Sequence, residues 1–454
     1  MNNFNFNIIS VALDLGSSVF KAAAGYKNDN GLVVIATEEE PSGGVKEGFI
    51  DNLNDAALHI GRLLKKLENR IANILKEQNC FPEKHTMSIE KVYVNISAGC
   101  TQATMSPIER YLGNSEILES TIEEMCEENS RRCQAQNNAK FVFYTSFPSR
   151  YLVDGLEAKK PVGMVSEHIK VEFQNIWIRK GLTEKIRECI DRGAHIKNCE
   201  FVLSAKSISN IVLTQEEKEN GVLLVNFGAQ VTSVSVFKDK EMKYLVELPK
   251  GSERITDDLC ELHIPRDVAK KIKEQSCAVA AWEENENFHE TINGTSREFE
   301  RWVIANIVEK RIEAIFSSVE KAKNQTVWGK NVGLVVLTGG GSNLRFCAQK
   351  AQEVLGVNVR LGSIDVFKKR QKQARSLSAV LGFLLENGGH SLRFAEVVEQ
   401  KIVEDAKTPE EPKKKRRKKN NGIKEIFRQG KMVLQHNFID FMFSEDTSKE
   451  SDQF

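Results

Sequence analysis

Hydrophobic positions near the start of the chain follow the spacing of strands first and of a helix afterwards. Residues 8–15 form a continuous apolar run that stops at a Gly-Ser-Ser turn, and residues 32–37 form a second β-rich run after an Asn-Gly turn signal. Apolar residues then recur every three or four positions in residues 56–76. The pattern predicts a hairpin followed by an amphipathic helix.

A smaller α+β unit is predicted next along the chain. Residues 92–97 and 141–145 have the composition of strands, and residues 119–136 between them have helical spacing. We place this unit at about 88–170, with residues 171–205 returning to the first lobe.

The second half of the chain repeats the pattern of the first. Residues 222–237 read as strand, glycine-containing turn and strand, which suggests an internally duplicated α/β fold. A charged, helical region at 257–320 precedes an apolar strand at 332–337 that ends in Thr-Gly-Gly-Gly-Ser. The first lobe is expected to comprise residues 8–87 and 171–205. The second lobe is expected to comprise residues 206–395, with an upper part at about 250–315.

Beyond about residue 395 the composition changes. Residues 396–421 are predicted to be a disordered linker, because most of them are Lys, Glu, Pro or Asn and few are apolar. Residues 422–443 regain helical spacing, and residues 444–454 form a predicted acidic, disordered tail. On a wheel of 100° per residue, the large apolar side chains of 422–443 fall within about 140°. They are Ile423, Ile426, Phe427, Val433, Leu434, Phe438 and Phe441.

A basic face adjoins this apolar face. It carries Lys424, Arg428 and Lys431, and seven consecutive basic residues occupy 413–419 just upstream. Large apolar groups beside cations are typical of a helix that lies in the interface of a membrane with anionic headgroups. The alternative is a helix that packs on a partner protein or on the protein's own body. In other proteins, a basic run such as 413–419 is commonly a solvated linker or a nucleic-acid-binding patch. Here the adjacent amphipathic helix favours membrane binding instead.

Composition narrows the class of protein. A chain of 454 residues with 41% hydrophobic residues can bury the cores of two or more lobes. The nine cysteines form no C-x-x-C pair, which favours a reducing compartment. No stretch approaches the roughly 18 apolar residues of a transmembrane helix, so we expect a chain that is neither exported nor membrane-spanning. The net charge of +1 includes the basic run, and the rest of the chain is acidic, so we expect no nucleic-acid partner.

Candidate chemistry lies at three glycine-containing turns that each follow an apolar strand. They are residues 14–18 (DLGSS), 228–230 (GAQ) and 339–342 (GGGS). Backbone N–H groups at such turns can approach a phosphate, and an aspartate at a strand end can hold a hydrated Mg²⁺. Any one of them alone is more often a simple tight turn.

In their order and separation, the three turns resemble the two phosphate loops and the adenosine loop of the actin superfamily. Stretches unconnected with nucleotide narrow the resemblance to the FtsA family of bacterial cell-division proteins. They are YLVDGLEAKKPVGMVSEHIKVE at 151–172, LTQEEKENGV at 213–222, ITDDL at 255–259, EKRIEAI at 309–315, VVLTGGGSNL at 335–344 and SLSAVLGFLL at 376–385. The resemblance implies two actin-like lobes with a small inserted subdomain and a C-terminal amphipathic helix.

The same resemblance implies a function and sites. A member of this family would be an adaptor at the cytoplasmic face of the inner membrane, at the division site. It would tether FtsZ polymers by binding their C-terminal peptide, self-associate as actin does and help to recruit downstream division proteins. The FtsZ contacts would be Arg301, Asn306 and Arg311. A site for ATP, with an accompanying Mg²⁺ near Asp14, would comprise Asp14, Gly16, Ser17, Ser18, Lys21, Gly228, Thr232, Lys273, Gly339, Gly340, Gly341 and Ser342.

The chain departs from the family pattern at the nucleotide site. The family's second phosphate loop is close to D-x-GGGT-x-D, and this chain has Asn226 and Ser233 at the two acidic positions. In actin-like ATPases the second aspartate helps to organise Mg²⁺ and the attacking water. Lys270 replaces the glutamate of the family's A-E-x-x-K segment near the ribose. We therefore expect weak ATP binding with little or no hydrolysis, and the alternative is a pocket that is only structural.

Sites typical of other enzymes are not evident in the sequence. The eight histidines are dispersed without metal-ligand spacing, and there is neither a G-x-S-x-G elbow nor a Walker A loop. Two alternatives of other classes remain: an actin-like adaptor of a pilus or secretion machine, and an ATP-dependent enzyme or chaperone of the same superfamily. Turnover assays would separate an enzyme from an adaptor.

Overall fold

The computed structural model describes residues 5–46, 48–82, 84–96, 101–136, 138–276, 287–292, 295–364, 371–386 and 389–396. These residues belong to one compact unit, which ends at Val397. The expected linker beyond its first residue, the amphipathic helix at 422–443 and the acidic tail lie outside the described residues. Among the helices that are described, none is long and apolar enough to cross a membrane.

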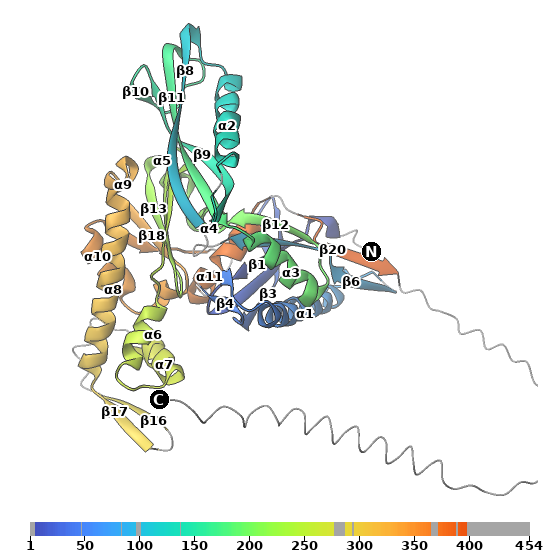
Figure 1. Cartoon of the computed structure of the whole chain (residues 1–454). Helices are drawn as coiled ribbons and strands as arrows, with labels where there is room; N and C mark the ends of the chain where they lie inside the picture. Colours follow the sequence, from blue (N-terminus) through green and yellow to red (C-terminus); the bar gives the residue numbers. More distant parts are fainter. Residues whose placement is uncertain are drawn as a thin grey trace, which may run out of the picture. The chain divides into compact units, whose positions relative to one another are not determined.

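The first lobe is built on a five-stranded sheet in the order β12-β7-β1-β2-β3 (Figure 1). Three consecutive strands form an antiparallel meander, and β7 and β12 extend it in parallel on the other side of β1. The strands are β1 Ser10–Leu15, β2 Val19–Asn28, β3 Gly31–Pro41, β7 Lys91–Ile96 and β12 Asn198–Leu203. The predicted hairpin is therefore a meander whose middle strand was missed.

Two long helices cover this sheet. Helix α1, Leu53–Glu77, confirms the predicted amphipathic helix, and its N-terminus is capped by the Asn52 side chain, which accepts from the Asp55 N–H. Helix α3, Leu182–Ala194, packs against α1 at a pair of glycines. A Cβ on Gly61 would lie 2.2 Å from the Gly193 carbonyl oxygen, so only glycine allows this approach. The lobe also contains β4 Val45–Lys46, β5 Phe49–Ile50 and the short 3₁₀ helix η1 Phe6–Ile8.

The second lobe repeats the topology of the first. Its sheet has the order β15-β14-β13-β18-β19, again an antiparallel meander extended in parallel. The strands are β13 Val222–Phe227, β14 Thr232–Lys238, β15 Glu241–Leu248, β18 Leu334–Thr338 and β19 Asn358–Leu361. The predicted duplicated α/β fold is confirmed. Helices of this lobe are α5 Gln215–Asn220, α9 Val327–Lys330, α10 Cys347–Leu355 and α11 Gln371–Ser376.

The upper part of the second lobe is not entirely helical. Helices α6 Glu253–Cys260 and α7 Arg266–Ser276 are separated from α8 Arg301–Asn324 by a hairpin of β16 Phe288–Ile292 and β17 Thr295–Phe299. The prediction of one helical region over 257–320 is therefore wrong at this point. The Phe, Thr and Ile side chains of the hairpin favour strands over helix.

The inserted unit is a four-stranded antiparallel sheet, β10-β9-β11-β8, with α2 packed on one face (Figure 1). Its elements are β8 Thr101–Glu116, α2 Glu119–Gln134, β9 Phe141–Val153, β10 Leu156–Ala158 and β11 Val165–Arg179. It therefore begins and ends later than the expected 88–170, because β7 pairs within the first lobe and β11 runs on to Arg179. Local composition identified β7 and the start of β9, but it missed β8, β10 and β11 and could not assign strand partners.

The end of the described chain returns to the first lobe, although residues up to 395 were expected in the second. Strand β20, Leu392–Glu396, pairs antiparallel with β6, His85–Ile89. The Ser391 hydroxyl accepts from the Val11 N–H at 2.9 Å. Helix α12, Ser378–Phe383, packs on α4, Ser204–Val212, and on β1. An apolar run such as 376–385 can pack on either lobe, so the sequence did not show this return.

Candidate nucleotide site

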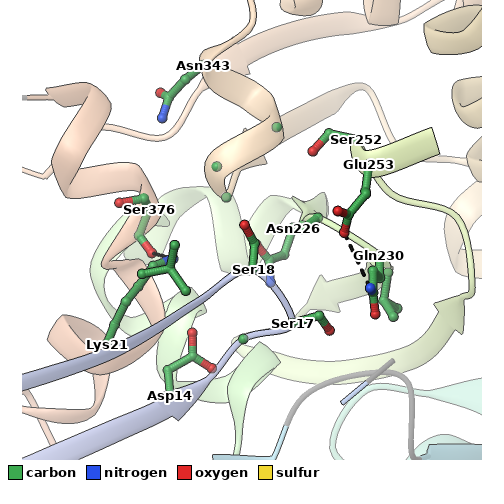
Figure 2. A pocket seen from close by; sticks show the side chains of 18 of the residues that line it. Asp14, Ser17, Ser18, Lys21, Asn226, Gln230, Ser252, Glu253, Asn343 and Ser376 are labelled. Carbon is green, nitrogen blue, oxygen red and sulfur yellow. Dashed lines mark hydrogen bonds between the residues drawn. The ribbon is translucent and has the colours of Figure 1, made fainter. Parts of the chain in front are cut away.

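A cavity of about 480 Å³ lies where the turns that follow β1, β13 and β18 meet α7 and α11 (Figure 2). Most of the predicted nucleotide residues line it. They are Asp14, Gly16, Ser17, Ser18, Lys21, Gly228, Lys273, Gly339, Gly340 and Gly341. The structure thus brings together three segments that are more than 300 residues apart at their extremes.

The first two turns are equivalent positions of the duplicated lobes. Each connects the first and second strands of its sheet, and a Cβ on Gly16 or Gly228 would lie 2.7 Å from the carbonyl oxygen of Val19 or Val231. The backbone is therefore as tightly folded in the second turn as in the first. Tight turns of this kind expose the N–H groups that a phosphate can accept from.

The third turn depends on glycine for a different reason. Gly339 has a φ of +86°, which favours glycine, and a Cβ on Gly341 would lie 2.7 Å from the Phe227 ring. The 3₁₀ helix η4, Gly340–Asn343, follows directly. The third turn therefore lies against the end of β13, beside the second turn.

Asp14 and Lys21 form the charged pair of the site. They face each other across β1 and β2, and the pKa of Asp14 is raised, because burial outweighs the opposing effect of the Lys21 charge. The Lys21 ammonium also donates to the Ser376 carbonyl oxygen at 2.7 Å. Figure 2 shows both side chains on the same side of the cavity.

The equivalent pair in the second lobe is uncharged. Asn226 and Ser233 face each other across β13 and β14, as Asp14 and Lys21 do in the first lobe. Glu247 lies beside Ser233 on β15, hydrogen-bonds to it, and has its pKa raised to about 8 by burial. At neutral pH this carboxyl is therefore largely protonated.

Two of the predicted residues lie outside the cavity lining. Thr232 is fully buried and its hydroxyl donates to the Lys250 carbonyl oxygen at 2.6 Å. Ser342 is also buried and donates to the Gly339 carbonyl oxygen at 2.6 Å. Both hydroxyls hold the backbone of a turn, so their roles are structural.

Other residues of the cavity were missed by the sequence reasoning. Helical spacing on α7 could have placed Glu274 beside Lys270 and Lys273, since positions three and four apart share a face. The others come from different parts of the fold, and although Asn343 and Ser376 lie in stretches that carry the family resemblance, nothing in those stretches marked them as site residues. Among them are Glu39, Ser252, Glu253, Asn343, Lys372 and Ser376.

The three residues expected to contact FtsZ lie on α8 but not on one face of it. At 100° per residue, Asn306 lies about 140° around the helix from Arg301 and from Arg311, and these two arginines are about 80° apart. The Arg311 guanidinium is held by both oxygens of Asp258 at 2.5 Å.

The arrangement fits the phosphates of a nucleotide. Mg²⁺ is usually held by one or two carboxylates together with phosphate oxygens and water. Asp14 is the carboxylate beside the first turn and would hold such an ion through water, whereas Asn226 and Ser233 supply neutral groups at the second. Within the described ranges, no three His, Cys, Asp or Glu side chains gather as a metal site of their own.

Two lobes of the same topology around a cavity lined by three such turns define an actin-like protein. Residues 223–382 match the model of the family described as "Cell division protein FtsA". The chain is 26% identical over 393 residues to cell division protein FtsA of Bacillus subtilis (strain 168), with 85% of each chain covered. It is 24% identical over 361 residues to the FtsA of Enterococcus hirae, with 77% of each covered. Over most of its length the chain is therefore similar to FtsA cell-division proteins.

A solved structure shares the fold without sharing the sequence. A PilM-PilN type IV pilus biogenesis complex aligns with a TM-score of 0.58 at 16% identity, over 83% of this chain and 98% of that one. This likeness concerns the actin-like fold alone.

Proposed function

We propose that the protein is an adaptor that tethers FtsZ polymers to the cytoplasmic face of the cell membrane at the division site. The observation that carries the proposal is the match to FtsA proteins over most of the chain, on an actin-like body. Downstream division proteins would be recruited to the same assembly, and the chain would self-associate through its actin-like lobes.

The membrane contact would be made by residues 422–443. Their apolar positions, among them Phe427 and Phe438, would enter the interface, and the basic residues at 413–419 would be attracted by anionic headgroups. Burying one such side chain contributes about 1.5–3 kcal/mol before ordering costs. Each basic residue near an anionic surface adds about 1 kcal/mol, which salt weakens.

The nucleotide site would bind ATP weakly and turn it over little or not at all. Hydrolysis needs a group that orients or deprotonates the attacking water and charges that hold Mg²⁺. Asn226 and Ser233 provide neither in the second lobe, and Lys21 is already bound to the Ser376 carbonyl. Binding would rest on the backbone N–H groups of the glycine turns and on the Asp14 side of the cavity.

The FtsZ peptide would bind to the upper part of the second lobe. Of the three expected contacts, Arg311 is engaged with Asp258, so a peptide carboxylate would have to displace that pair. Arg301 and Asn306, at the start of α8, remain the candidates on this helix.

Co-sedimentation with liposomes tests the anchor and the tether together. The full chain should pellet with anionic liposomes and bring FtsZ with it, whereas Phe427→Glu or Phe438→Glu should leave both in solution, because a charge must then enter the apolar layer. The control is Leu58→Glu at an exposed position of α1, which changes charge equally outside the tail. Neutralising 413–419 should weaken pelleting mainly on anionic lipid at low salt. Equal pelleting of all variants would contradict the anchor, and pelleting without FtsZ would contradict the tether.

A further inference from the structure

Helix α2, Glu119–Gln134, is fixed to the sheet of the inserted unit by its inner face. The buried residues of the helix are Met125, Asn129 and Cys133. The Asn129 amide nitrogen donates to the Asn175 side-chain oxygen at 2.8 Å, and the Asn129 oxygen accepts from the Ser106 hydroxyl at 2.8 Å. The Asn175 amide donates to the same hydroxyl oxygen at 2.7 Å. Because turning the helix would leave these buried amides unpaired, α2 presents one defined face to solvent.

Glu127 and Arg131 lie at the centre of that outer face. At 100° per residue, each is about 160° around the helix from the buried Asn129, and both side chains are exposed. Figure 1 shows α2 on the outside of the inserted unit, with the sheet on its inner side. The outer face is therefore accessible to another molecule.

Charge is divided along the outer face. Glu119, Glu123 and Glu127 are exposed and four residues apart, and Arg131 continues the row in the last turn of the helix. Side chains four apart are neighbours on a helix surface, so the acids of the row repel one another. Within the described ranges, none of these four side chains forms an ion pair, whereas Glu128 beside the row pairs with two arginines. The row thus carries unpaired charge of both signs, acidic first and basic at its end.

A row of this kind is complementary to a second copy of itself turned antiparallel. A two-fold axis beside Asn129 brings Glu127 of one copy to Arg131 of the other and, by symmetry, Arg131 of the first to Glu127 of the second. A partner that was basic throughout would meet Arg131, and one that was acidic throughout would meet the three glutamates. Charge complementarity therefore favours a second copy over a partner of one sign.

We propose that the outer face of α2 is a contact between two copies of the chain related by a two-fold axis. The proposal rests on the self-association proposed above and adds a contact of another kind. Stacking of actin-like lobes is head to tail and extends a polymer, whereas a two-fold contact closes on itself and joins neighbouring polymers side by side. Exposed ion pairs are individually weak, so the contact forms where the chains are concentrated on a membrane.

Two variants with exchanged charges test this contact. Glu127→Lys makes the centre of the face basic and Arg131→Glu makes it acidic, so neither variant pairs with itself but the two pair with each other. The full chains are mixed in equal amounts on vesicles of phosphatidylglycerol and phosphatidylcholine and treated with a carbodiimide, which joins an amine to a carboxylate in direct contact. Mass spectrometry then measures the peptide that links position 127 of the first variant to position 131 of the second.

The control mixture contains Glu77→Lys, at the exposed end of α1, in place of Glu127→Lys. We expect the link from 127 to 131 to be at least about fivefold more abundant than the link from 77 to 131, since two like-charge contacts become two opposite-charge contacts. Arg131→Lys keeps the natural charge and supplies an amine. The same link should therefore also form between unlabelled and isotope-labelled copies of this variant.

Links from 127 to 131 that are no more abundant than those of the control, while other links between chains are found, would overturn the α2 contact alone. Links from 127 to 131 that form only within one chain of Arg131→Lys would overturn it as well. If the wild type forms no link between chains at any position, the self-association proposed above is overturned together with the α2 contact.

Discussion

The contact between the inserted unit and the second lobe gives a prediction with a magnitude. Strand β15 is an edge strand of its sheet, so its outward backbone groups have no strand partner. The buried Gln174 side chain takes that place: its amide donates to the Leu245 carbonyl oxygen at 2.9 Å and accepts from the Leu245 N–H at 2.7 Å. Beside it, the Ser149 hydroxyl donates to the Lys243 carbonyl oxygen at 2.6 Å.

Gln174→Leu removes both hydrogen bonds and keeps most of the volume of the side chain. Two buried backbone groups of Leu245 then lose their partner, and each such group costs about 1–3 kcal/mol. We expect a loss of about 3 kcal/mol in the free energy of local opening at β15. This corresponds to a loss of about a hundredfold in the protection of the Leu245 amide.

Hydrogen exchange followed by mass spectrometry measures this protection on peptides that cover β15. It reports local opening even when unfolding of so long a chain is not two-state. Gln134→Leu, at an exposed position on α2, is the matched control and should leave β15 unchanged. If exchange of β15 in Gln174→Leu stayed within threefold of the wild type, the reasoning about this contact would be refuted.

Three further predictions concern chemistry and assembly. ATP turnover by the full chain should be at background, and a rate like that of ordinary actin-like ATPases that Asp14→Ala abolishes would contradict this. The Glu247 carboxyl keeps its proton up to about pH 8 in the folded chain but loses it above about pH 4.5 when unfolded, so its contribution to stability falls as pH rises between these values. The free energy of unfolding of Glu247→Gln, measured in urea, should therefore rise by at least about 1 kcal/mol relative to that of the wild type as the pH is raised from 5 to 8. A difference between the two proteins that did not change with pH would argue against this. Self-association should strengthen on lipid monolayers, where two-dimensional confinement raises the effective concentration, and electron microscopy that finds only dispersed monomers at high surface density would count against it.

Amphipathic periodicity was enough to predict helices with one buried face, and it failed for the strand inside the first meander. Helix α1 has the predicted apolar stripe, and its members Ile60, Leu67 and Ile71 are fully buried. Strand β2 has alanines at its centre, and alanine has a low preference for strands. Ala22 and Ala24 are buried in the core of the first lobe and Ala23 in the core between the two sheets. Strand β2 forms because its alanines pack against a core on each face of the sheet, and no local sequence pattern shows this packing.

Long-range pairing explains the other misplaced boundaries. Strand β6 is separated by about 300 residues from its partner β20, and β7 is held by β1 and β12 rather than by its neighbours in the chain. The glycine-containing turns could be found from the sequence, because their tight backbone geometry requires glycine at particular positions. Lys372 and Ser376 reach the same cavity only because the chain returns from the second lobe to the first.

Duplication makes the two sides of the phosphate end directly comparable. In the first lobe, Asp14, Lys21 and Glu39 are neighbours across β1, β2 and β3. In the second lobe, the neighbours across β13, β14 and β15 are Asn226, Ser233 and Glu247. The sequence revealed that the two acidic residues are replaced. Only the strand register shows that the one carboxyl left in the second-lobe row is that of Glu247. Burial keeps this carboxyl protonated at neutral pH. Lys21, the basic residue of these rows, therefore lies on the first lobe. The second-lobe row thus contributes the neutral groups of Asn226 and Ser233 to the cavity, where the first-lobe row contributes Asp14, Lys21 and Glu39.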